Sequence, residues 1–251
     1  MIHSAFIKCF QFFVLWLPGF LFAQTLPAQG LANTWNNFEG KLGNSDIQMS
    51  LYLFKNGDLK GNYILKYIGT KILISGTKKG NIVGLTEQIS GQPSRNFSGK
   101  IIGDSLVGTW IDIAPRPALH FMLRLMSSTT GSFEHRYTDI LGTTENVEQF
   151  VQTARSAILS GNKDWIADHT TYPLKHLVGN GYNGIANKQQ LIQHFSQIFT
   201  KEFKEKISQV FTTNLFVKNA SVMLGNGELW ISNKPGSTKD LFDYTIIAIN
   251  P

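Results

Sequence analysis

The chain has 251 residues, of which 42% are hydrophobic and 16% charged, a balance that indicates a globular protein rather than a disordered one. Its formal net charge is +6, but the longest basic run is Lys78-Lys79, which argues against nucleic-acid binding. The only cysteine is Cys9, so a chain that loses its first residues has no disulfide, thiol nucleophile or cysteine metal site.

Residues 1–23 have the pattern of a secretory signal peptide. His3 and Lys8 give a polar start, an apolar run follows from Phe10 to Phe22, and Ala23 ends a cleavage site. The apolar run has roughly 13 residues, whereas a membrane-spanning helix needs about 20. We therefore expect a secreted or periplasmic protein with no integral membrane segment after cleavage.

Residues 30–126 alternate apolar and polar side chains in short runs broken by Gly, Asn and Asp, which is typical of strands joined by tight turns. A loose repeat (apolar, any, Gly, polar, apolar) recurs around Gly40, Gly61, Gly99 and Gly108, and the run around Gly76 keeps most of it; the repeat indicates tight bends or a bulge in a closing sheet. We predict the strands Asn36–Lys41, Ile47–Phe54, Leu59–Tyr67, Lys71–Thr77, Ile82–Glu87, Arg95–Ile101, Leu106–Ile111 and Ala118–Leu125.

One face of each predicted strand is apolar, and the opposite faces carry polar residues such as Gln48, Asn62 and Arg124. This pattern predicts an eight-stranded antiparallel meander that closes into a small all-β barrel, since closure removes exposed edges. The strands with Gly61-Asn62-Tyr63 and Gly108-Thr109-Trp110 resemble those of lipocalin and avidin-like barrels. Such a barrel either fills itself with side chains or holds one small ligand, and both alternatives stay open.

The composition of residues 127–145 is typical of a linker. After it, the spacing of apolar residues changes from every second residue, as in strands, to about every 3.6 residues, as in helices. We predict a second domain at 146–251, an α+β cone in which a curved antiparallel sheet surrounds helices. Its expected elements are a helix from Asn146 to Ser160, a helix Lys163–His169, a strand Tyr172–Val178, a helical segment capped by Asn187, and strands Leu215–Val217, Ser221–Ser232 and Leu241–Ile249. Gly179–Gly184 reads as a loop, and Gly225-Asn226-Gly227 as a bend in the long strand.

This order of elements resembles the nuclear transport factor 2-like superfamily, also described as ketosteroid-isomerase-like or SnoaL-like. The resemblance is carried by Gly161–Asp164 after the first helix, by Tyr172-Pro173-Leu174, and by Met223–Ile231. It implies a cone with a central pocket. Because the superfamily includes isomerases, dehydratases and ligand-binding domains, it does not imply one reaction.

The candidate pocket residues are Tyr172 and His176 on one strand and Glu228 and Trp230 on another. Together they would offer a general base, a proton donor and a stacking ring, so His176, Tyr172 and Glu228 are the catalytic candidates. Leu229 and Ile231 form an equally good inward face, which would place Glu228 and Trp230 outside. No metal or cofactor is expected, because the histidines lack metal-ligand spacing.

The function expected first is that of an exported, non-catalytic binding protein of the cell envelope that holds a small molecule or an envelope protein. One alternative is a small isomerase, lyase or hydrolase with its site in the cone. Another is a periplasmic inhibitor or immunity-type protein. Whether the chain is an enzyme stays open, although the sequence favours a protein that is not one. A further expectation is a homodimer that forms through the C-terminal sheet.

Overall fold

The structure is a computed structural model that describes residues 32–89, 92–113, 116–178 and 181–251. The side chains of residues 89, 92–94, 175–178 and 181–183 lie outside this description, and so does the leader predicted at residues 1–23.

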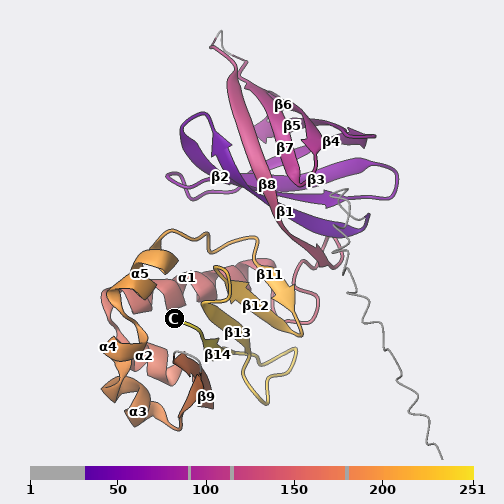
Figure 1. The fold of residues 1–251 in the computed structure, drawn as a ribbon. Helices are drawn as coiled ribbons and strands as arrows, with labels where there is room; N and C mark the ends of the chain where they lie inside the picture. Colours follow the sequence, from indigo (N-terminus) through magenta and orange to yellow (C-terminus); the bar gives the residue numbers. More distant parts are fainter. Residues whose placement is uncertain (1–31, 90–91, 114–115, 179–180) are drawn as a thin grey trace, which may run out of the picture.

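The first eight strands form a closed antiparallel barrel, in which each strand pairs with the next and β8 returns to β1 (Figure 1). The predicted barrel is confirmed. The strands are β1 (Thr34–Leu42), β2 (Ser45–Leu53), β3 (Asp58–Leu65), β4 (Ile72–Lys79), β5 (Ile82–Ile89), β6 (Gln92–Ile102), β7 (Ser105–Ile111) and β8 (Leu119–Thr130). Because β8 continues to Thr130, the first residues of the predicted linker belong to the last strand of the barrel.

The recurring glycines lie where neighbouring strands approach closely. A Cβ at Gly61 would be 1.9 Å from the backbone oxygen of Ser50, and one at Gly76 would be 1.9 Å from that of Gly84. Real Cβ atoms do not come this close to an oxygen, so any side chain there would push the strands apart. The glycine repeat is therefore a requirement of the tightly coiled barrel wall.

The C-terminal region contains a six-stranded sheet of order β10-β9-β14-β13-β12-β11, and its helices share one hydrophobic core with the sheet. β14 pairs with β9 in parallel and the other pairs are antiparallel, so the sheet is mixed, whereas the sequence predicted an antiparallel one. The long connection between β9 and β14, which passes through helices, is the kind that parallel pairing requires. The strands are β9 (Thr170–Val178), β10 (Gly181–Ile185), β11 (Phe216–Lys218), β12 (Ser221–Leu224), β13 (Leu229–Asn233) and β14 (Tyr244–Ile249).

The five helices of the described residues include one long one, which begins after a capping box at Thr143 and ends at Gly161. The expected helical segment after Asn187 is divided into three short helices. The helices are α1 (Thr144–Ser160), α2 (Lys163–Asp168), α3 (Lys188–Gln193), α4 (Phe195–Ile198) and α5 (Lys201–Ser208). In the described ranges, none of them has the length and hydropathy that a membrane span requires.

Two predicted features of the sheet are wrong in detail. The strand expected at Ser221–Ser232 is a hairpin, because Gly225 and Gly227 have φ of 70° and 115° and reverse the chain between β12 and β13. Residues 181–184 of the segment expected to be a loop belong to β10, which pairs with β9 along the edge of the sheet, and residues 179–180 lie outside the described ranges.

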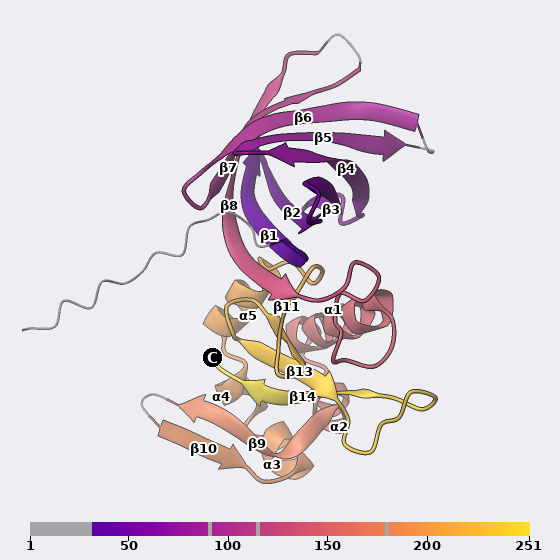
Figure 2. The ribbon, with the colours of Figure 1, turned by 90° about the vertical axis from the view of Figure 1, so that its right-hand side faces the viewer.

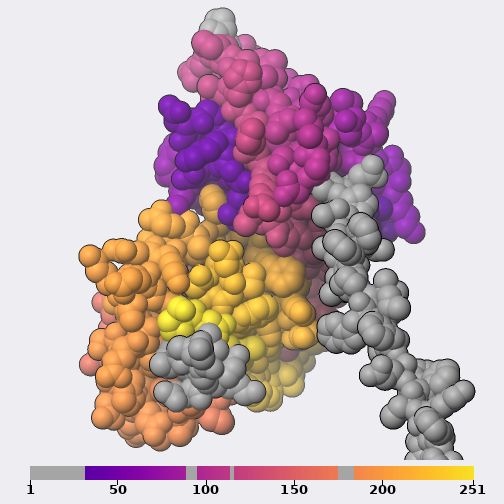
Figure 3. All heavy atoms as spheres, in the orientation of Figure 1, coloured from indigo at the N-terminus to yellow at the C-terminus, as the bar shows by residue number. Residues whose placement is uncertain are grey.

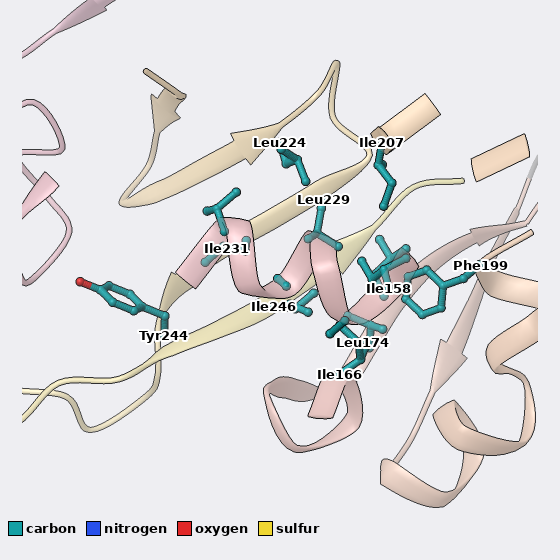
Figure 4. Packing of buried hydrophobic residues seen from close by; sticks show 14 of the residues in the cluster. Ile158, Ile166, Leu174, Phe199, Ile207, Leu224, Leu229, Ile231, Tyr244 and Ile246 are labelled. Atoms are coloured by element: carbon teal, nitrogen blue, oxygen red, sulfur yellow. The ribbon is translucent and has the colours of Figure 1, made fainter. Parts of the chain in front are cut away.

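The buried hydrophobic residues form two clusters. One fills the barrel, and the other lies between α1, the shorter helices and the sheet (Figure 4). The barrel lies on the side of the C-terminal region that carries α1, α5 and β11, and β9 and β10 lie on the far side (Figures 1 and 2). The space-filling view shows the two surfaces in contact (Figure 3).

Candidate functional site

The outer wall of the barrel has a hollow of about 710 Å³ across β5 to β8. Successive residues of a strand point to opposite faces, so the residues between the core positions turn outward here. The inward positions hold Phe97, Leu106 and Phe121, all buried in the barrel cluster. The outward side chains that shape the hollow include Lys41, Ile82, Lys100, Val107, His120 and Met122.

This wall is unusually apolar for a surface. Ile82 is 55% exposed and Met122 is 67% exposed. Of the twelve large hydrophobic side chains that are exposed in the described part of the chain, ten belong to the barrel: Tyr67, Ile68, Leu73, Ile82, Ile102, Ile111, Ile113, Leu119, Met122 and Met126. Two of these ten, Ile82 and Met122, line the hollow, and exposed apolar side chains that lie together are typical of an interaction surface.

The ionisable side chains at the hollow are basic ones. Lys41, Lys100 and His120 line it, and its lining residues include no aspartate or glutamate. Lys41 is paired with Asp46 at 2.5 Å, and this ion pair is exposed. The chemistry of the hollow is therefore an apolar floor with a basic rim, which suits an apolar surface bordered by acidic groups.

The interior of the barrel is filled. Its hydrophobic cluster leaves a space of about 20 Å³ beside Leu59 and Leu106, which is room for about one water molecule. The sequence left open whether the barrel is filled by its own side chains or holds a small ligand, and the described side chains agree with the filled barrel.

One buried carboxylate lies inside the barrel and is fully hydrogen-bonded. Glu87 is fully buried and accepts hydrogen bonds from the Tyr63 hydroxyl and the Trp110 Nε1, both at 3.1 Å. Arg95 pairs with Glu87 at 3.2 Å and lies over the Trp110 ring at 5.5 Å. Burial, together with the negative charge of Glu87, raises the pKa of Tyr63, so the phenol keeps its proton. The four side chains satisfy one another, which is the arrangement of a structural network.

The candidate residues of the C-terminal region have separate surroundings. The hydroxyl of Tyr172 donates to the backbone oxygen of Ala167 at 2.9 Å, and burial raises the pKa of Tyr172 to about 12. His176 pairs through its backbone with Asn183 and Ile249, and its side chain lies outside the description. Among the described contacts, Tyr172 is held by the end of α2 rather than by another catalytic candidate.

Glu228 and Trp230 lie at and beyond the β12–β13 turn. The carboxylate of Glu228 accepts from the backbone N–H of Asn226 at 2.6 Å, within the turn. Leu229 and Ile231 are 0% and 1% exposed and face the helices (Figure 4), so Trp230 between them faces away. The inward face that holds Leu229 and Ile231 is therefore the one that the structure shows. A catalytic or ligand-binding role for Tyr172, His176, Glu228 and Trp230 stays a prediction.

Within the described ranges, no group of three or more His, Cys, Asp or Glu side chains is placed to hold a metal ion. Neither family models, nor curated proteins, nor solved structures give a match to this chain.

The sequence did not single out the residues of the outer wall. A signal was available, because Ile82, Val107 and Met122 are apolar residues at positions where the alternation expects polar ones. Apolar residues at outward-facing positions of a barrel strand do not pack in the core, so they indicate a surface that contacts another molecule.

Proposed function

We propose that this protein is an exported, non-catalytic binding protein that docks a partner protein of the cell envelope on the outer wall of its barrel. The observation that carries the proposal is the apolar hollow over β5 to β8 with its basic rim. Since the barrel interior is filled, the outer wall offers far more room for a partner than the space enclosed by the strands.

The partner's chemistry follows from the hollow. Ile82, Val107 and Met122 suit aliphatic or aromatic side chains, and Lys41 and Lys100 suit acidic groups around them. The hollow is open rather than enclosed, as protein-docking surfaces are, whereas small-molecule sites bury most of their ligand.

The experiment places a photo-reactive amino acid at Met122 in the full chain, expressed in the source organism. Leu241 is the matched control, because it is also apolar, is 80% exposed and lies in the C-terminal region. We expect light to produce a covalent adduct with a second protein at Met122 and none at Leu241.

A charge reversal tests the rim. Lys100→Glu is expected to reduce the yield of the Met122 adduct by about tenfold, since it puts a like charge against the acidic partner. Lys239→Glu, on an exposed loop, is expected to leave the yield unchanged. Equal adducts at Met122 and Leu241, or adducts at Met122 only with lipids or small molecules, contradict the proposal.

We also propose that the C-terminal region is a nuclear transport factor 2-like cone. The support is the long helix α1 lying across a sheet whose inner face carries Leu224, Leu229 and Ile246 (Figure 4). An experimental structure of this chain in which α1 and the β9-β14-β13-β12 order superpose on a member of that superfamily would support it, and an experimental structure with a different strand order would contradict it.

A further inference from the structure

A second pocket, of about 190 Å³, lies where the barrel meets the C-terminal region. Residues of β1 and β2 form one side of it, and the segment from Gln209 to Phe216 forms the other. Its volume is about six times the ~30 Å³ that one water molecule takes up in the liquid. The pocket therefore suits a small molecule of a few non-hydrogen atoms.

A carboxylate is held in place at this pocket. Glu39 accepts a hydrogen bond from Gln48 Nε2 at 3.0 Å. Gln48 is 4% exposed, and its own Oε1 accepts from Asn214 Nδ2 at 3.1 Å and from the Thr213 hydroxyl at 3.3 Å. Asn214 is fixed in turn, because its Nδ2 also donates to Asn62 Oδ1 at 2.8 Å. The network orients Gln48, and Gln48 orients one oxygen of Glu39.

The charge of Glu39 is not neutralised within the described part of the chain. Arg124 is the residue opposite Glu39 on β8, but its Nε donates to Asp104 at 2.8 Å. In the described contacts, the second carboxylate oxygen of Glu39 has no hydrogen-bond partner, and no cation pairs with the group. A positioned, partly buried anion with a free oxygen is a site for a cation.

The other walls decide which cation fits. Met126, Phe211, Phe216 and Met223 line the pocket with apolar and aromatic surface. A metal ion needs several free oxygen ligands, whereas the amide oxygens of Asn37 and Gln48 at this pocket already accept hydrogen bonds from Arg136 and Asn214. An alkylated ammonium group needs one anion and apolar or aromatic walls.

We infer that this junction pocket binds a small organic cation, whose ammonium group pairs with Glu39 and whose alkyl groups lie against Met126, Phe211, Phe216 and Met223. The site is separate from the outer hollow over β5 to β8, and it does not depend on the function proposed for that hollow.

The test uses choline as the probe and its neutral isostere 3,3-dimethylbutan-1-ol as the matched control, titrated into the full chain by calorimetry. Choline is expected to bind, and the isostere to bind at least about tenfold more weakly, because it lacks the charge that Glu39 recognises. The side-chain amide signals of Gln48 and Asn214 are expected to shift in NMR spectra with choline.

Glu39→Gln is the decisive variant, because glutamine keeps the acceptor for Gln48 and removes only the charge. It is expected to weaken choline binding at least about tenfold. Glu134→Gln, at an exposed position, is expected to bind as the unaltered chain does. Lys66 donates to Gln209 at the edge of the pocket at 2.8 Å, so Lys66→Met is expected to tighten choline binding about twofold.

Three results would overturn the inference: choline that does not bind at millimolar concentration, a neutral isostere that binds as tightly as choline, or Glu39→Gln that binds choline as the unaltered chain does. Thermal unfolding of each variant shows whether a lost signal reflects an unfolded protein, and Lys66→Met keeps the inference testable in that case, because it is expected to raise affinity.

Discussion

Buried tyrosines couple the stability of this protein to alkaline pH. Tyr244 is buried, and its hydroxyl donates to the backbone oxygen of Leu141 at 2.7 Å. Burial, with the charge of Asp243, raises the pKa of Tyr244 to about 12. The pKa of Tyr172 is likewise raised to about 12 by burial and by Asp168. Both phenols are thus held in the neutral form.

The direction of the pH effect follows from this. A tyrosine in the unfolded chain loses its proton near pH 10, whereas the folded groups lose theirs near 12. Their contribution to stability is complete below about pH 10 and is lost as the pH rises toward about 12. We expect urea unfolding to show a falling free energy over this range, with a smaller fall for Tyr244→Phe. An equal fall in the variant and the unaltered chain contradicts the assignment.

Single residues were also the hardest features to predict from the sequence. Glu87 ends a predicted strand, and nothing beside it in the chain marks it as buried. Its partners Tyr63 and Trp110 come from β3 and β7, which only barrel closure brings together. The pairing is set by the fold, so local sequence patterns do not contain it.

At the scale of elements, the barrel wall depends on glycines that approach a neighbouring strand. We predict that Gly61→Ala lowers the free energy of unfolding by about 1–3 kcal/mol, because its Cβ would lie 1.9 Å from the Ser50 oxygen. Gly84→Ala is the control in the same barrel, since a Cβ there has nothing within 4 Å. We expect it to change stability by about 0.5 kcal/mol or less.

Chemical denaturation of the two variants measures this difference. If Gly84→Ala costs as much as Gly61→Ala, then lost backbone flexibility, and not the close approach of strands, explains the glycine repeat. The repeat itself was visible in the sequence, and so was its connection to closure, because five glycines share one strand position.

The eight barrel strands and α1 were predictable because their signals are local: alternation, turn residues and caps. The strand β10 was missed, because Gly181 and Gly184 give it the composition of a loop. The parallel pairing of β9 with β14 was missed because it depends on a partner about seventy residues away in the chain.

At the scale of the whole molecule, the alternation of side chains predicted solvent on one side of the barrel that is in fact covered. Gln48, Ser50 and Asn62 alternate with core residues as solvent-facing positions do, yet they are 4%, 0% and 7% exposed. The C-terminal region covers them, and a polar outer face cannot reveal that another part of the chain lies over it. Gln48 lines the candidate cation pocket and Asn62 accepts from Asn214 beside it, so the pocket depends on this covering and no local motif pointed to it.

Arg136 is central to this contact between the barrel and the rest of the chain. Its guanidinium is 3% exposed, donates to Ser50 Oγ at 2.8 Å and to Asn37 Oδ1 at 2.6 Å, and stacks 4.6 Å from the Trp35 ring. Burial lowers the pKa of Arg136. Its nearest described partners are neutral, so the geometry of the planar group, and not an ion pair, holds it.

We therefore predict an unusual order of substitutions. Arg136→Lys keeps a buried charge but loses the stacking and the forked hydrogen bonds, and we expect it to lower the free energy of unfolding by about 2 kcal/mol or more. Arg136→Met removes the charge and fills the space of the stem, while the Ser50 hydroxyl still donates to Asn37 at 2.7 Å. We expect it to cost about 1 kcal/mol or less.

Urea unfolding of both variants, followed by tryptophan fluorescence, measures the order, with Arg124→Lys as a control because Arg124 is 74% exposed. The control is expected to lie within about 0.5 kcal/mol of the unaltered chain. If methionine at this position costs more than lysine, the charge itself stabilises the contact, and a carboxylate must then compensate Arg136 from beyond hydrogen-bond distance. Glu148 would be the residue to test next, because its carboxylate accepts from the hydroxyl of Tyr137, the neighbour of Arg136, at 3.0 Å.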